Sequence, residues 1–245
     1  MPTNTGVPDG LDQFLSAATE VVESVLGDNL VAFYLGGSAA GQRFVHGKSD
    51  LDLIAVVHRS LSVAVKSQLV RRLWAILPPE QARGVETRVV TTDDLPGGRW
   101  FDLLVSTHPG EPSVADRDQD PVVMLELIHL RDASRALVGP PAETLIPDYE
   151  KTTVVVAMAE NIERSIGNNP ETYLVLNAAR SLAYLETGRL LSKIEGAQWA
   201  REIGRDPEIM DRAIAAQRGE LPDRPLTARG KRFVAEVIAA LRHED

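Results

Sequence analysis

Residues 35–52 of this chain read Leu-Gly-Gly-Ser-Ala-Ala-Gly-Gln-Arg-Phe-Val-His-Gly-Lys-Ser-Asp-Leu-Asp. An apolar run at 31–35 leads into this stretch, and a second apolar run at 53–57 follows it. Each run is typical of a strand that is buried on both faces. Asp50 and Asp52 would point to one face of the second strand, because side chains alternate along a strand. Two such carboxylates repel each other unless a cation lies between them, and Mg²⁺ is the usual cation where oxygen ligands also hold phosphate.

The Gly36-Gly37-Ser38 turn predicts a phosphate-binding element beside this acidic pair. A helix that begins here would offer backbone N–H groups to phosphate, and glycine has no Cβ to obstruct the approach. Ser38 and Ser49 add hydroxyl donors for the phosphates. Each serine also has a structural alternative, since Ser38 could cap a helix and Ser49 could form a turn. A phosphate cradle next to a magnesium pair indicates nucleotidyl transfer.

Two stretches of the chain resemble known enzymes. Gly-Ser followed by Asp-x-Asp is similar to the signature of the nucleotidyltransferase superfamily that includes DNA polymerase β. The second stretch resembles the C-terminal helical domain of the aminoglycoside adenylyltransferases that modify streptomycin and spectinomycin. It runs from Tyr173-Leu-Val-Leu-Asn-Ala-Ala-Arg180 to Gly188, then Ser192-Lys193 and Ala197-Gln-Trp199.

The resemblance implies an α+β fold, with a polymerase β-like mixed-sheet domain followed by an all-α helical bundle. It implies Mg²⁺-dependent transfer of AMP from ATP to a hydroxyl group of a cationic aminoglycoside or aminocyclitol antibiotic. Arg180 and Lys193 match positions that reach the nucleotide phosphates in similar enzymes. The change in composition puts the domain boundary near 140–150, so we predict domains at 1–147 and 148–245.

A third acid is expected near the pair, because a sugar hydroxyl is a poor nucleophile until a base takes its proton. Glu86 lies in the middle of a predicted strand, where glutamate is disfavoured, and similar enzymes use an acid here as the general base. Asp50, Asp52 and Glu86 are therefore the predicted metal ligands. Asp102 is an alternative third acid, since sequence alone does not set the register of its strand.

The substrate site is predicted from residue chemistry, because guanidinium and ammonium groups favour acidic and aromatic neighbours. Glu171, Trp100 and Tyr173 are the candidates. Streptomycin-modifying relatives carry an aromatic residue and an acid before the arginine helix. Residues 161–170 have neither in the expected place, and this departure argues against streptomycin.

Composition limits the class of protein. The chain has no cysteine, which excludes disulfides and thiolate sites and favours a reducing cytoplasm. A net charge of −9 argues against nucleic acid as the main partner and suits a small cationic substrate. No apolar run is long enough to span a membrane, and we expect a monomer. Two alternatives remain, namely a nucleotidyltransferase with another acceptor, such as a protein, and a non-catalytic nucleotide-binding protein.

Local patterns predict the remaining elements. Residues 1–8 read as a disordered lead. Strands are expected at 31–35, 51–57, 85–91 and 101–106, with a functional loop at 107–120. Helices are expected from Asp9 or Asp12 to 26, from Ser60 to 77, and at 122–137, 149–166, 171–188, 192–204, 206–218 and 227–243.

Overall fold

The computed structural model describes residues 6–108 and 112–243, so part of the predicted disordered lead (1–5) and of the predicted loop (109–111) lies outside the described residues. The chain divides into two compact units, residues 1–148 and 149–245. The first contains a sheet with helices, and the second contains only helices among its described residues. This confirms the predicted α+β fold class.

The first unit is built on one mixed sheet, whose strand order is β5-β4-β3-β2-β1-β6. Its strands are β1 (Leu30–Leu35), β2 (Leu51–Val57), β3 (Val85–Thr91), β4 (Trp100–Ser106), β5 (Ser113–Gln119) and β6 (Arg135–Val138). Only β2 and β3 pair in parallel. A parallel pair needs a long crossover, and α3 (Val63–Trp74) supplies it.

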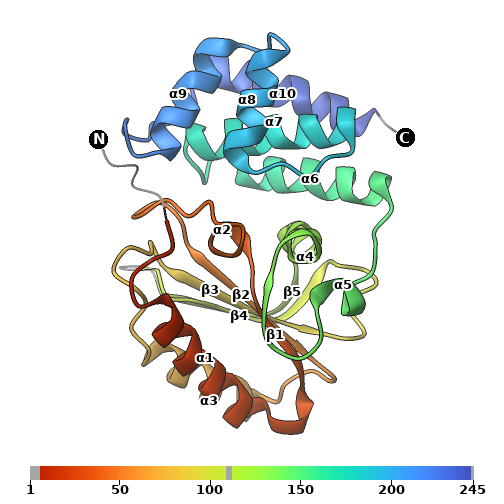
Figure 1. Ribbon diagram of the computed structural model, residues 1–245. Coiled ribbons are helices and arrows are strands. Elements are labelled where there is room, and N and C mark those ends of the chain that lie inside the picture. The colour runs from red at the N-terminus through yellow and green to blue at the C-terminus, as the bar shows by residue number, and fades with distance from the viewer. Residues whose placement is uncertain (1–5, 109–111, 244–245) are drawn as a thin grey trace. The chain divides into compact units, whose positions relative to one another are not determined.

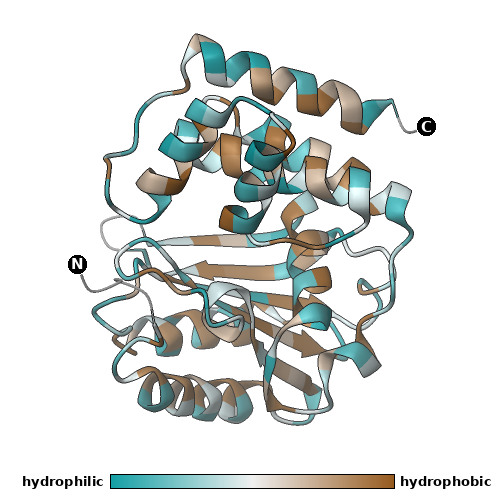
Figure 2. Cartoon of the chain, turned by 45° about the horizontal axis from the view of Figure 1, so that its top comes forward, coloured by the Kyte–Doolittle hydropathy of each residue, from teal (hydrophilic) through white to brown (hydrophobic). Residues whose placement is uncertain are grey.

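Two helices, α1 (Leu11–Leu26) and α3, cover one side of the sheet, and α4 (Pro121–Asp132) lies on the other side (Figure 1). The apolar stripe of α1 packs into a core with Phe33, Leu53 and Val89 from three strands. The central strands are mostly apolar along their length, whereas the helices alternate between apolar and polar residues (Figure 2). The short elements are η1 (Gly27–Asn29), α2 (Gly37–Ala40) and α5 (Ala142–Leu145).

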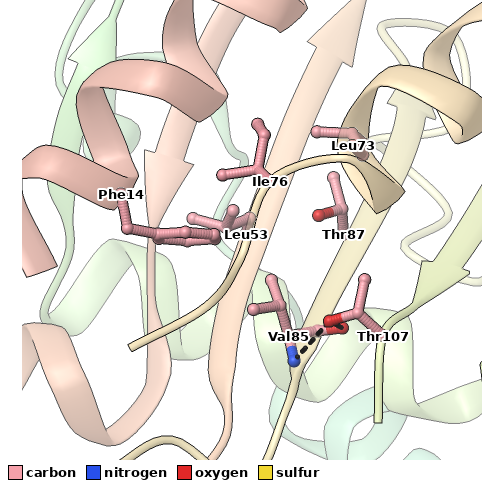
Figure 3. Close-up of a pocket in the computed structure, with 7 residues that line it drawn as sticks. All are labelled: Phe14, Leu53, Leu73, Ile76, Val85, Thr87 and Thr107. Carbon is pink, nitrogen blue, oxygen red and sulfur yellow. Dashed lines mark hydrogen bonds between the residues drawn. The ribbon is translucent and has the colours of Figure 1, made fainter. Parts of the chain in front are cut away.

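A small cavity of about 10 Å³ lies within this core, between the two helices and strands β2 and β3 (Figure 3). Its lining includes Phe14, Leu53, Leu73 and Thr87. A volume of this size holds about one water molecule, so the cavity is not a nucleotide site.

Three local predictions were wrong. Residues 113–119 were predicted as part of a loop but form the edge strand β5. This strand is held by backbone pairing with β4, which needs no alternation of apolar side chains, and nearly all of its side chains are exposed. The helix predicted at 122–137 ends at Asp132, and residues 135–138 instead form β6, which pairs with β1. The α3 helix begins at Val63, because Ser62 rather than Ser60 caps it by accepting a hydrogen bond from Val65 N.

The second unit contains five helices among its described residues, all within three residues of the predicted bounds. They are α6 (Lys151–Ser165), α7 (Glu171–Thr187), α8 (Lys193–Glu202), α9 (Pro207–Gln217) and α10 (Ala228–Arg242). Helix α7 contacts the other four helices, and 12 of its 17 residues are buried. It is therefore the central helix of this unit. No helix in the described part of the chain has the length and apolar character needed to cross a bilayer.

Candidate active site

The core of the candidate site is a pair of carboxylates on adjacent parallel strands. Asp52 on β2 lies directly opposite Glu86 on β3. Residues opposite each other in neighbouring strands project to the same face, so the two side chains are neighbours. This face is opposite to the α1–α3 core, to which Leu53 contributes. The register places Glu86 where the predicted third acid would be needed.

The glycine turn packs directly against this pair. Gly36 N donates a hydrogen bond to the carbonyl oxygen of Asp52 at 2.9 Å, so the turn is fixed to β2. Gly37 has a positive φ of 61°, and a Cβ built on it would lie 1.8 Å from Asp52 Oδ2. Only glycine fits here, because the backbone conformation and the carboxylate both exclude a side chain. The turn opens a helix, α2, of only four residues.

Asp50 lies two residues before Asp52 and is contacted by the side chains of Arg83 and His108. Arg83 contacts both of its oxygens, with Nε 2.7 Å from Oδ1 and Nη2 2.5 Å from Oδ2. His108 Nε2 lies 3.2 Å from Oδ1, and the other ring nitrogen, Nδ1, is 2.7 Å from Ser106 Oγ. Asp50 therefore belongs to the same acidic region and is charge-balanced within the first unit.

A buried arginine, Arg88, joins this face of the sheet to α4. Its Nη1 lies 3.3 Å from Glu86 Oε2 and 2.6 Å from Glu126 Oε1, and its Nη2 lies 3.6 Å from Asp120 Oδ2. Asp120 also caps α4, since Oδ1 accepts a hydrogen bond from Val122 N. Burial raises the pKa of Glu126 to about 8, although the Arg88 charge acts in the opposite direction. Arg88 thus fixes α4 beside the carboxylate pair.

Asp102, the alternative third acid, lies in a different environment. Its side chain is buried, with 1% exposed. Oδ2 accepts a hydrogen bond from Leu61 N at 2.8 Å, and Oδ1 lies 3.3 Å from Lys66 Nζ. Its carboxylate therefore holds the loop before α3 and the first turn of that helix. The register of β3 favours Glu86 as the third acid of the site.

The donor set fits a hard divalent cation in kind, because Asp50, Asp52 and Glu86 offer only oxygen ligands. Across residues 6–108 and 112–243, however, no three acidic, histidine or cysteine side chains are grouped closely enough to hold a metal ion. Arg83 accounts for the position of Asp50, since it engages both carboxylate oxygens. A cation held by all three acids would have to compete with this ion pair.

The two serines have different surroundings. Ser49 is buried, its Oγ accepts a hydrogen bond from Val45 N at 3.0 Å, and its carbonyl accepts one from Arg83 N. These contacts match the structural alternative, in which Ser49 forms a turn. In the bond from Val45 N the Ser49 hydroxyl acts only as an acceptor, so its proton is not used there. Ser38 lies in α2, directly after Gly37, and its carbonyl accepts a hydrogen bond from Arg43 N. Phosphate binding by both serines stays a prediction.

The second unit brings its predicted residues together on α7 and α8. Lys193 Nζ lies 4.8 Å from the ring centre of Tyr173, a cation–π contact. Gly196 lets α8 approach α7 at Arg180, because a Cβ on Gly196 would lie 2.5 Å from Arg180 Cα. Arg180, Lys193 and Tyr173 therefore lie along one helix–helix contact, and their roles remain predictions.

The surroundings of two predicted substrate residues, Trp100 and Glu171, argue against a substrate role. Trp100 is the first residue of β4, and Ser106 at the other end of that strand lies opposite Glu86. About 20 Å of strand therefore separates Trp100 from the carboxylate pair. Its ring is covered by Arg117 at 4.9 Å. Glu171 is 3% exposed, and its carboxylate accepts hydrogen bonds from Arg224 Nε and Thr227 Oγ1. It is therefore used inside the second unit.

Replacing Glu171 with glutamine should lower the free energy of unfolding by about 2 kcal/mol at pH 7, since buried hydrogen bonds to a charged group are lost. Although burial raises the pKa of Glu171, the bonds from Thr227 and Arg224 outweigh it and lower the pKa below 4.5. A lowered pKa stabilises the folded state above the unfolded value, and this contribution is lost as the pH falls through the folded value. The difference between wild type and E171Q should thus shrink below about pH 4.5.

Urea denaturation at several pH values from 7 down to about 3 measures this difference, with Glu236→Gln on the exposed side of α10 as the control. The control should change stability by less than about 0.5 kcal/mol. Equal stability of wild type and E171Q at pH 7 would remove Glu171 from this structural role.

Four residues of the site were not among the predicted functional residues, namely Arg83, Arg88, His108 and Glu126. Single basic residues in loops and strands carry no spacing signal, and the contacts of these residues arise from elements far apart in the chain. The one available signal was at Arg88, because a charged residue in the middle of an otherwise apolar strand needs a buried partner.

Comparison with known proteins adds independent information. Residues 144–241 match the family described as "Aminoglycoside adenylyltransferase, C-terminal domain". A comparison with curated protein sequences finds no match. Among solved structures, the chain is similar to spectinomycin adenyltransferase AAD(9) from Enterococcus faecialis, determined with ATP and spectinomycin.

That structural similarity covers 94% of this chain and 99% of the other chain, with a TM-score of 0.76 and 18% sequence identity. At this identity the structural similarity establishes only the fold, and it does so for both units. The family match is a separate finding, and nearly all of it lies in the second unit. The C-terminal part of the chain therefore matches the C-terminal domain of the aminoglycoside adenylyltransferases, and the chain as a whole has the fold of the spectinomycin adenyltransferase structure.

Proposed function

We propose that the protein transfers AMP from ATP to a hydroxyl group of an aminocyclitol or aminoglycoside antibiotic, and so confers resistance to it. The observation that carries this proposal is the pairing of Asp52 with Glu86 beside the Gly37 turn. The match of residues 144–241 to the adenylyltransferase C-terminal domain points to the antibiotic, and the similar solved structure was determined with ATP and spectinomycin.

In the proposed reaction, the antibiotic hydroxyl oxygen attacks the α-phosphorus of ATP. The new oxygen–phosphorus bond forms as the bond from the α-phosphorus to the bridging oxygen breaks, and pyrophosphate leaves with that electron pair. Glu86 takes the hydroxyl proton, so that the attacking oxygen carries negative charge when it reaches phosphorus. The carboxylate is in place for this step because β3 holds it beside Asp52.

Asp50 and Asp52, with Glu86, would hold Mg²⁺. When bound, the cation neutralises charge on the triphosphate and on the departing pyrophosphate. Gly37 leaves room for the Asp52 carboxylate, because a Cβ at this position would lie 1.8 Å from Asp52 Oδ2.

We also propose that Arg180 and Lys193 bind the nucleotide phosphates, since phosphoryl transfer depends mainly on positioning and charge neutralisation. The close contact of α8 with α7 at Gly196 holds the two helices that carry them. Tyr173, whose ring lies against Lys193, would face the same ligand. The absence of cysteine is compatible with action in the cytoplasm.

Spectinomycin is the preferred substrate in this proposal. The stretch at 161–170 lacks the aromatic–acid pair of streptomycin-modifying relatives, and Glu171 uses its carboxylate inside the protein. A streptomycin guanidinium group would therefore miss the acidic partner that it needs on this segment.

Pyrophosphate release from ATP, measured with Mg²⁺ and either spectinomycin or streptomycin, tests the proposal. We expect release with spectinomycin, with mass spectrometry showing one added AMP, and a kcat/KM for streptomycin at least about tenfold lower. ATP binding without pyrophosphate release for any small acceptor would favour the non-catalytic alternative. Release only with a protein acceptor would favour the other alternative.

Gly37→Ala should reduce kcat/KM by about 100-fold or more, because the new methyl group would displace the Asp52 carboxylate. Gly47→Ala is the matched control, since Gly47 also has a positive φ, of 70°, but nothing lies within 4 Å of its Cβ position. The control should lose about 1 kcal/mol of stability from backbone strain and retain its activity. Equal activity of the two variants would show that Gly37 does not position Asp52.

A further inference from the structure

Arg83 is a cationic residue at the proposed metal site that plays no part in the function as described so far. Its guanidinium engages both oxygens of Asp50, at 2.7 and 2.5 Å. Asp52 and Glu86 add to the negative field around it. Arg83 thus balances the charge of the carboxylates that would bind Mg²⁺.

The backbone around Arg83 is fixed, whereas its side chain is accessible. Arg83 N donates a hydrogen bond to Ser49 O at 2.9 Å, and Leu51 N donates one to Gly84 O at 3.0 Å. The loop is therefore attached to both sides of Asp50. The side chain of Arg83 is 56% exposed, so the guanidinium can leave Asp50 by side-chain rotation alone.

A divalent cation and this guanidinium compete for the same two oxygens. A cation with two charges gains more from three carboxylates than a guanidinium does, particularly when it arrives with a polyanion. The displaced guanidinium remains attached to the fixed loop, within one side-chain length of Asp50. The nearest new anion is then the triphosphate that the cation holds, and a guanidinium pairs well with phosphate oxygens.

We propose that Arg83 is a further nucleotide-binding residue, which pairs with Asp50 in the free protein and passes to the triphosphate when a divalent cation takes its place. This inference rests on the proposed function, because it assumes that Asp50 is a metal ligand for ATP. It assigns Arg83 two effects of opposite sign: weaker binding of a cation alone, and tighter binding of the cation–nucleotide complex.

Arg83→Gln tests both effects, because glutamine removes the charge from an accessible side chain. Mn²⁺ is the probe for the cation alone, measured by electron paramagnetic resonance without nucleotide. The α,β-methylene analogue of ATP is the probe for the complex, measured by calorimetry at saturating Mg²⁺. We expect R83Q to bind Mn²⁺ about tenfold more tightly and the analogue about tenfold more weakly than wild type.

Two further variants complete the experiment. Arg71→Gln on α3 removes the same charge from another exposed position and should change neither affinity by more than about twofold. Arg83→Lys keeps the charge without the planar fork and should fall between wild type and R83Q. Thermal denaturation checks that each variant is folded.

Unchanged affinity of R83Q for either Mn²⁺ or the analogue would overturn the inference. Failure of the wild type itself to bind Mg²⁺ with the analogue would instead contradict the proposed function. The two failures are distinguishable, because the first is a comparison between variants and the second concerns the wild type alone.

Discussion

Replacing Glu86 with glutamine should lower the rate of AMP transfer by about 10²–10⁴-fold, while the affinity for Mg²⁺-ATP changes by less than about threefold. Glutamine keeps the shape of the side chain but does not take a proton from the antibiotic hydroxyl. Asp52, its neighbour across the strand pair, still offers a carboxylate to the cation. Single-turnover kinetics for the chemical step and calorimetry for nucleotide binding measure the two quantities separately.

Asp102→Asn is the matched control, because Asp102 was the other candidate for the third acid. Its carboxylate holds Leu61 N and faces Lys66, so the variant should lose stability but keep its turnover per folded molecule. Wild-type turnover in E86Q would remove Glu86 from the base role. A loss of turnover in folded D102N would return that role to Asp102.

At pH 9, where Glu126 is ionised, replacing Arg88 with methionine should lower the free energy of unfolding by about 3–5 kcal/mol, as expected when one partner of a buried ion pair is removed. Glu126 and Asp120 on α4 would lose the group that draws this helix to β3. Glu86 is less affected, because 29% of its side chain is exposed and water can hydrate it. Urea denaturation followed by circular dichroism measures the loss.

The pH dependence of this loss has a definite sign. Arg88 opposes the rise that burial causes in the pKa of Glu126, so the pKa in R88M should lie above 8. A carboxyl group with a raised pKa stabilises the folded state at low pH, and this contribution disappears as the pH rises through the folded value. The destabilisation of R88M should therefore be larger at pH 9 than at pH 6.

A double variant separates the charge from the packing. Arg88→Met with Glu126→Leu removes both members of the closest pair and should recover most of the lost stability, because no buried carboxylate of that pair remains. If the double variant were as unstable as R88M, the effect would come from the shape of the arginine and not from its charge.

The central elements could be predicted from sequence because their signals are local. The apolar runs before and after residues 36–50 predict buried strands, and the five helices of the second unit follow from periodicity, caps and breakers. The edge strands β5 and β6 were missed for the opposite reason. Their pairing uses backbone groups of distant strands. The exposed side chains of β5 carry no apolar pattern, and the apolar residues of β6 continue the apolar run of the preceding helix.

The sequence by itself determined the α+β class and the two-part order of sheet and helices, because these depend on residue type and spacing within short windows. Only the tertiary structure decided that Glu86 rather than Asp102 lies beside Asp52, and that Arg83 and Arg88 hold the surrounding carboxylates. It also showed that Arg117 covers the Trp100 ring and that Arg224 pairs with Glu171. The physical reason is strand register and direction, since these bring together residues that are far apart in the chain and are not encoded in any single stretch.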